Sequence, residues 1–142
     1  MRLITVFSVL AVLTSASPAK AQVENAPSLP TPASVFLEDL TWVELRDAIA
    51  AGKTTVIIPT GGTEQNGPIM VLGKHNYLVR YKAGEIAKQL GNAIVAPVLP
   101  YVPEGEIPGA KPAAGHMRFP GTITTPEDAY EKVLEYAARS LK

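Results

Sequence analysis

Apolar residues recur at helical spacing in three stretches of the chain, and each stretch carries end signals. In the first, Thr41 and Glu44 form a capping-box pattern ahead of a short helix that Gly52 closes. The second is an amphipathic stripe that Gly91 ends, made of Val79, Ala83, Ile86 and Leu90. The third begins at the cap sequence Thr125-Pro126-Glu127-Asp128 and continues as an apolar stripe to Leu141. The pattern predicts three helices.

Two short apolar runs between these helices predict β-strands. Thr54–Ile58 is β-branched throughout and predicts a strand buried on both faces that stops at Pro59, and Ala93–Val98 predicts a second buried strand. The alternation of helix and strand predicts an α/β layered fold, with a mostly parallel sheet flanked by helices. Because the sheet is small and the final stripe has no terminator after Leu141, we expect this chain to be the front part of a longer protein.

The start of the chain predicts export. A basic Met1-Arg2 start precedes the apolar run Leu3–Leu13, and Ala19-Lys20-Ala21 predicts signal-peptide cleavage before Gln22. The alternative is a membrane anchor, but the run is shorter than the roughly 18 residues that span a bilayer. We therefore expect a signal peptide at 1–21, a flexible proline-rich leader at 22–34 and an α/β domain at 35–142. The expected location is periplasmic or secreted, with no stable membrane anchor.

The amino-acid composition excludes several kinds of functional site. The chain has no cysteine, which excludes disulfides, thiolate nucleophiles and iron–sulfur sites. Its 13 basic residues balance 13 acidic ones, so no basic face for nucleic acid is expected. A metal site would have to use oxygen ligands and imidazole, and the two histidines are His75 and His116.

Metal-capable side chains gather in the loop Thr60–His75, which leaves the first predicted strand at its carboxyl end. Ligands bind at that end of strands in open α/β sheets. Glu64, Asn66 and His75 offer oxygen and imidazole ligands that suit zinc or manganese in a hydrolytic site. The alternative is purely structural, with Asn66 in a turn, Glu64 in solvent and His75 at a helix start. A phosphate loop at Gly61-Gly62 is disfavoured because neither G-x-G-x-x-G nor a Walker lysine motif is present.

Three segments resemble the creatininase family of metal-dependent amidohydrolases. The run P-T-G-G-T-E-Q-N-G-P, which starts at Pro59, is similar to the family's P-x-G-S-x-E-Q-H-G-P signature. The segment G-H-M-R-F-P-G-T-I, which starts at Gly115, resembles the family's E-H-x-x-F-P-G-T-I, and the stretch Val95–Tyr101 resembles its strand–proline region. The resemblance covers roughly Leu37–Lys142 and implies a creatininase-like α/β fold.

The resemblance also implies a metal site with an atypical signature. Glu64 matches the glutamate that binds one of the family's two divalent ions. Asn66 stands where the family has a histidine, His75 where it has a bridging aspartate, and Ile69 where it has a second histidine. The family's remaining ligands come from an N-G-H-x-x-N segment that nothing in this chain matches. A neutral imidazole binds one ion where a carboxylate can bridge two, so we expect one zinc or manganese ion rather than two.

Two functions remain open on these residues. One is an exported amidohydrolase with a mononuclear or rebuilt site, which hydrolyses the C–N bond of a small-molecule amide or lactam. The other is a ligand-binding member of the same fold that has lost its dinuclear metal site and does not hydrolyse its ligand. His116 is a candidate substrate-binding residue beside the active site, with Arg118 and Tyr101 as weaker candidates. The family's ring assemblies imply a homo-oligomer by analogy alone.

Overall fold

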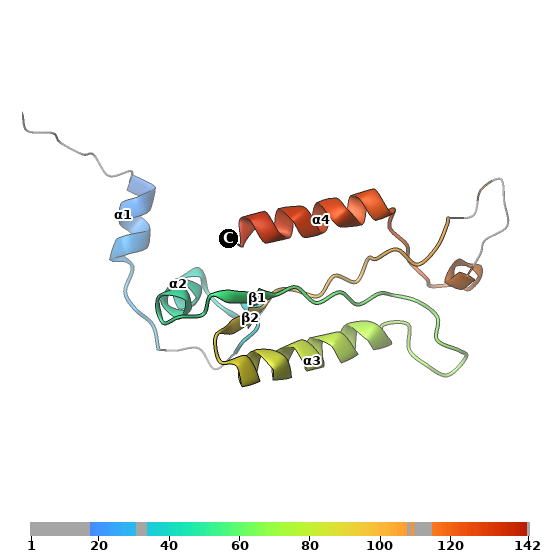
Figure 1. Cartoon of the computed structure of the whole chain (residues 1–142), viewed down its shortest axis with the longest axis horizontal. Coiled ribbons are helices and arrows are strands. Elements are labelled where there is room, and N and C mark those ends of the chain that lie inside the picture. Colours follow the sequence, from blue (N-terminus) through green and yellow to red (C-terminus); the bar gives the residue numbers. More distant parts are fainter. Residues whose placement is uncertain (1–17, 31–33, 108, 110–114, 142) are drawn as a thin grey trace, which may run out of the picture.

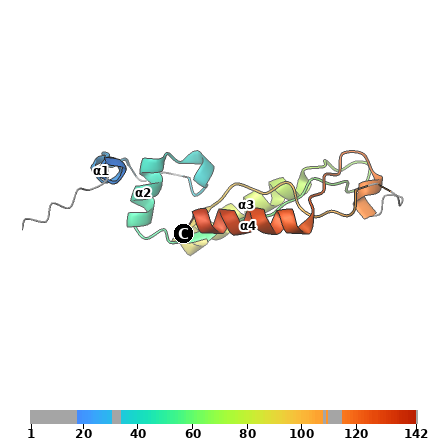
Figure 2. The same cartoon turned by 90° about the horizontal axis from the view of Figure 1, so that it is seen from above.

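The computed structural model describes residues 18–30, 34–107, 109 and 115–141, and it confirms the α/β class. Helices α3 and α4 lie on opposite sides of a small sheet (Figures 1 and 2). In chain order the elements are α1 (Pro18–Asn25), η1 (Leu37–Asp39), α2 (Trp42–Ala50), β1 (Thr55–Ile57), α3 (Lys74–Leu90), β2 (Ala93–Val95), η2 (Gly115–Arg118) and α4 (Glu127–Ser140), where η marks a 3₁₀ helix.

The two strands are parallel, as the order of the elements predicts. They pair in the register Thr55↔Ala93, Val56↔Ile94 and Ile57↔Val95. Pairing continues past the strands, because Thr60 and Leu99 form an isolated parallel bridge and the Gly61 amide donates to the Leu99 carbonyl at 2.9 Å. The chains that leave β1 and β2 therefore stay side by side at their carboxyl ends.

The ends of the helices follow the expected chemistry. The Thr41 hydroxyl accepts from the Glu44 amide at 3.2 Å, and the Glu44 carboxylate accepts from the Thr41 amide at 2.7 Å, which completes the capping box. Helix α3 ends at Gly91, whose φ of +75° is the left-handed conformation that glycine adopts without strain.

The buried core is small and lies between α3 and β2. Ala83 and Ala87 of α3 pack against Ala93 and Val95 of β2, with three half-buried residues around them, Val35, Phe36 and Ile57. Small side chains on α3 let the helix approach the sheet closely. A Cβ on Gly84 would lie 2.7 Å from Phe36 Cζ, so this position accepts only glycine without a shift.

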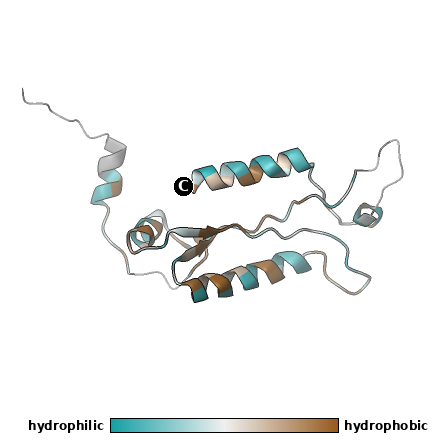
Figure 3. Ribbon diagram, viewed as in Figure 1, coloured by the Kyte–Doolittle hydropathy of each residue, from teal (hydrophilic) through white to brown (hydrophobic). Residues whose placement is uncertain are grey.

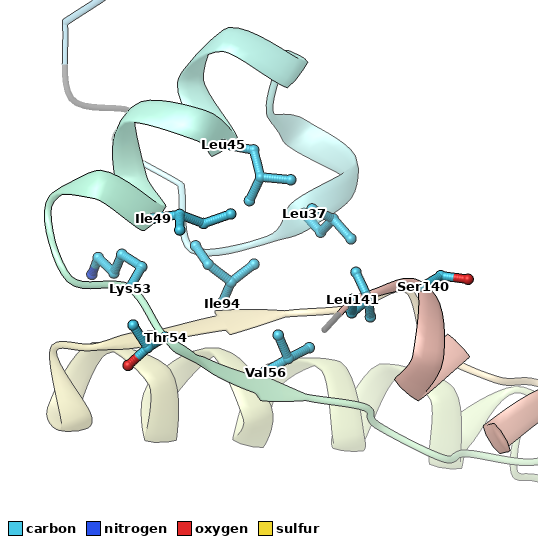
Figure 4. Close-up of a pocket in the computed structure, with 9 residues that line it drawn as sticks. All are labelled: Leu37, Leu45, Ile49, Lys53, Thr54, Val56, Ile94, Ser140 and Leu141. Atoms are coloured by element: carbon cyan, nitrogen blue, oxygen red, sulfur yellow. The ribbon is translucent and has the colours of Figure 1, made fainter. Parts of the chain in front are cut away.

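One face of β1 is more exposed to solvent than the sequence predicts. The β-branched run predicts burial on both faces, but Val56 is 38% exposed. Val56 lines an apolar cavity of about 360 Å³ between α2, the sheet and the end of α4. Figure 4 shows Leu45, Ile49 and Leu141 around the same space. The prediction was wrong because hydrophobicity indicates which residues need covering but not whether a second layer reaches them.

Helix α4 carries its apolar stripe without burying it. No residue of α4 in the described part of the chain is buried, and Val133 and Tyr136 are exposed. Hydrophobic colour in Figure 3 marks the sheet and parts of α3 and α4. The helix forms as its cap and spacing predict, yet it contributes little to the core.

The predicted cleavage point lies inside α1, while residues 1–17 of the predicted signal peptide and residues 31–33 of the predicted leader lie outside the described residues. Part of the leader is helical rather than irregular. The Arg46 guanidinium donates to the carbonyls of Val23 at 2.8 Å and Ala26 at 3.0 Å, so α2 holds this segment. Among the described helices, none has the length and apolarity to cross a membrane.

Candidate metal centre

The loop after β1 is held by the segment that follows η2, and this pairing positions Glu64. Thr63 forms an antiparallel bridge with Ile123, whose amide donates to the Thr63 carbonyl at 2.9 Å. The Glu64 amide donates to the Leu72 carbonyl at 3.2 Å. The Thr63 hydroxyl also accepts a hydrogen bond from the side-chain amide nitrogen of Asn76 at 3.3 Å, which connects the loop to the start of α3. The backbone on both sides of Glu64 is thus fixed by neighbouring segments.

Glu64 is a buried carboxylate between two histidines. The residue is 7% exposed, and no other charged residue that the structure describes is buried. His75, in the first turn of α3, places Nε2 2.8 Å from Glu64 Oε1. His116, in η2, brings Nδ1 into contact with Glu64 Oε2. A carboxylate so far removed from water needs partners of positive or hydrogen-bonding character, and the two imidazoles flank both of its oxygens.

A third acidic group, Glu104, joins the site from the loop after β2. Its amide donates to the Thr124 hydroxyl at 3.0 Å, which fixes its backbone. Burial raises the pKa of Glu104, and the hydrogen bond and negative charge of Glu64 raise it further, whereas His116 lowers it. The Glu64 and Glu104 carboxylates are therefore close enough to interact electrostatically.

Sequence reasoning missed Glu104, although a signal for it existed. Glu64 lies six residues beyond the end of the predicted strand at Ile58, and Glu104 lies six residues beyond the end of the predicted strand at Val98. Carboxylates at matching distances beyond two adjacent parallel strands are expected to meet, because the carboxyl ends of such strands lie at one edge of the sheet. The proline-rich surroundings of Glu104 offered no motif that pointed to this match.

The side chains fit a divalent ion. Donor atoms of Glu64, Glu104 and His116 all lie within 4.8 Å of one another. His116 Nδ1 is buried and, despite its contact with Glu64, makes no hydrogen bond. Two carboxylates and an imidazole form a donor set that zinc and manganese accept. An imidazole nitrogen without a hydrogen bond, beside two mutually repelling carboxylates, is the arrangement that a cation would satisfy.

The other residues that the sequence assigns to the site, Asn66, Arg118 and Tyr101, are not part of the group formed by Glu64, Glu104 and His116. The Asn66 amide oxygen accepts from Lys74 Nζ at 2.5 Å, and its nitrogen donates to the Glu64 carbonyl at 3.2 Å, so its described contacts are structural. Arg118 donates to the Gly115 carbonyl and lies over the Phe119 ring. Tyr101 is 58% exposed. The structure thus brings together Glu64, His75 and His116, and the substrate-binding roles of Arg118 and Tyr101 stay predictions.

Comparison with known proteins places this site in a family. The family model Creatininase, described as creatinine amidohydrolase, matches residues 38–142. The creatinine amidohydrolase of Pseudomonas putida is 29% identical over 116 residues, covering 76% of this chain and 43% of that protein. The mycofactocin precursor peptide peptidase of Mycolicibacterium smegmatis is 33% identical over 90 residues, covering 60% of this chain and 33% of that protein.

Solved structures agree with the sequence comparison. A structure titled "Creatininase Mn" is 30% identical and has a TM-score of 0.61, covering 76% of this chain and 40% of that one. A structure of a mutant creatininase of the "Zn-Zn type" has a TM-score of 0.60 and 28% identity, with a similar coverage of 76% and 42%. The chain thus spans less than half the length of the relatives it matches. On the family match and these likenesses, the chain belongs to the creatininase family.

Proposed function

We propose that this protein is an exported, metal-dependent amidohydrolase that hydrolyses the C–N bond of a small-molecule amide or lactam. The observation that carries the proposal is the buried Glu64 carboxylate at the carboxyl end of the sheet, with an imidazole at each oxygen. The similar proteins include a creatinine amidohydrolase and a peptide peptidase, and similar structures are titled with manganese or zinc. These names support hydrolysis of a C–N bond and a divalent ion.

In this proposal the protein side chains hold the ion, which polarises the substrate, and exclude water. A divalent ion bound here supplies Lewis-acid polarisation of the substrate carbonyl. Glu64 provides a buried negative charge to hold it, and His75 fixes the orientation of that carboxylate through its Nε2. Glu104 and His116 close the site from the side of the β2 loop. The walls of the site also exclude water from Glu64, which strengthens every charge interaction around it.

The test compares protein stripped of metal by a chelator with the same protein resupplied with zinc or manganese. Hydrolysis is followed on a panel of lactams, formamides and short peptides. We expect activity to return with metal and to be lost in Glu64→Gln, which keeps the shape of the side chain and removes its charge. Glu106→Gln is the matched control, because Glu106 is an exposed residue of the same loop that carries Glu104.

One observation favours the second candidate, a binding protein without hydrolytic activity. Asn66 stands at the position where the family's signature has a histidine, and its side-chain oxygen accepts a hydrogen bond from Lys74. If metal resupply restores no hydrolysis of any panel member while the protein still binds an amide, the binding function is correct and the hydrolase proposal is wrong.

A further inference from the structure

Two side chains from the β2 loop reach the carboxylate that the β1 loop provides. The creatininase signature draws its early ligands from the loop after the first strand, and in this chain that loop has Asn66 and His75 in place of two of them. Asn66 Oδ1 is paired with Lys74. Glu104 and His116 instead approach Glu64 from positions 40 and 52 residues further along the chain. The structure therefore contains a donor set that the signature does not specify.

We propose that this chain binds a single divalent ion through Glu64, Glu104 and His116, and that His75 is a positioning residue that holds Glu64 rather than a ligand. The inference rests on the proposed function, since it assumes that the site holds a metal. It reverses the sequence-based expectation for the two histidines. His116 moves from the substrate wall to the metal, and His75 moves from the metal to a supporting position.

Distances separate the two histidines. Ligands of one zinc ion lie about 2.0–2.2 Å from it, so their donor atoms lie within roughly 4.4 Å of one another. The donor atoms of Glu64, Glu104 and His116 all lie within 4.8 Å of one another, a few tenths of an ångström above this limit, and His75 is not part of this group. His75 Nε2 lies 2.8 Å from Glu64 Oε1, which is a hydrogen-bond distance. Ligating carboxylates are held by such hydrogen bonds in many metal sites.

Charge supports the same assignment. The proposed ligands carry two carboxylates and one neutral imidazole, which together balance the charge of a divalent ion. The Glu64 and Glu104 carboxylates lie close together, with donor atoms within 4.8 Å of each other. The Nδ1 atom of His116 is buried and makes no hydrogen bond in the described structure. One cation among the three side chains would screen the two carboxylates from each other and give the nitrogen a partner.

Gly62 makes room for Glu104. Its φ is +131°, and a Cβ built on it would overlap Glu104 Oε1 and lie 3.3 Å from a methyl group of Val102. Gly67 offers a matched control in the same loop. Its φ is also positive, at +82°, but nothing lies within 4 Å of its Cβ position. Gly62→Ala and Gly67→Ala both place alanine at a positive φ, but only Gly62→Ala brings the new methyl group onto the Glu104 carboxylate.

The test loads the full-length protein with one equivalent of zinc and counts imidazole ligands by X-ray absorption spectroscopy. We expect one imidazole in the unmodified protein, one in His75→Leu and none in His116→Asn. Zinc affinity is measured in parallel by competition with a chromophoric chelator. Glu104→Gln should weaken binding by more than about 100-fold, above the range of 10–100-fold found for residues that only support ligands. Glu106→Gln should leave affinity unchanged.

Two further variants test the supporting roles. His75→Gln keeps a hydrogen-bond donor near Glu64, so it should retain more affinity than His75→Leu. Gly62→Ala should lower affinity clearly more than Gly67→Ala.

The outcomes separate the inference from the proposed function. Two imidazoles in the unmodified protein, with one lost in His75→Leu, would overturn the inference and leave a metal-dependent hydrolase in place. Tight binding of two zinc ions, or an unchanged zinc affinity in Glu104→Gln, would also overturn the inference without overturning the metal-dependent hydrolase. Failure of the unmodified protein to bind zinc or manganese at all would overturn the proposed function together with the inference.

Discussion

Metal removal should destabilise the fold measurably, because the proposed site joins segments that are far apart in the sequence. Glu64 lies after β1, whereas Glu104 and His116 lie after β2. The buried apolar cluster that the structure describes between α3 and β2 consists of four small or medium-sized side chains, Ala83, Ala87, Ala93 and Val95. An ion that bridges the loops therefore adds a restraint where apolar packing adds little.

The magnitude follows from mass action. An ion present at about 100 times its dissociation constant stabilises the native state by about 2.7 kcal/mol. For a chain of this size, 1 kcal/mol shifts the Tm by about 4 °C, so saturation should raise the Tm by about 10 °C. The assay is thermal unfolding followed by circular dichroism, with chelator and then with increasing zinc.

The controls make the result specific. Glu106→Gln should show the full shift, and Glu64→Gln should show almost none. A Tm that does not change between chelator and saturating zinc would refute the reasoning. An equal shift in Glu64→Gln would also refute it, because the stabilising ion would then bind elsewhere.

Three further predictions concern packing, capping and processing. Val95→Ala should lower the free energy of unfolding by about 2 kcal/mol because it opens a cavity in the fully buried core, whereas Val133→Ala on exposed α4 should change it by less than about 0.5 kcal/mol; chemical denaturation measures both. Thr41→Ala should cost about 1 kcal/mol. The backbone and hydroxyl of Thr41 lower the pKa of Glu44, so this stabilisation is present at neutral pH and lost as the pH falls through the lowered pKa, and Thr41→Ala should weaken that acid dependence in a pH series of unfolding curves. N-terminal sequencing of exported protein should begin at Gln22, and a retained Met1 would contradict the predicted cleavage.

Local signals in the sequence predicted the elements well. The capping box at Thr41 and the helix stop at Gly91 depend on residues close together in the chain, and the parallel order of the strands follows from the helix between them. The structure confirms all three. The exposure of Val56 could not be predicted in the same way, because it depends on whether α4 and α2 close over the sheet.

The candidate site was predictable only in part, for a related reason. Glu64 follows a strand and carries a recognisable motif, so its place at the carboxyl end of the sheet could be anticipated. Glu104 carries no motif, and its position depends on how the β2 loop aligns with the β1 loop through the Thr60–Leu99 bridge. The roles of His75 and His116 depend on distances to one carboxylate, which spacing along the chain does not fix.

The central claim is that Glu64 is the principal carboxylate of a metal site, and metal content tests it most directly. The measurement is zinc and manganese per subunit in purified full-length protein, by elemental mass spectrometry, compared with Glu64→Ala. The account predicts about one ion per subunit in the unmodified protein and essentially none in the variant, because a site with so few ligands does not survive the loss of its buried carboxylate. Metal-free protein, or an unchanged metal content in Glu64→Ala, would contradict it.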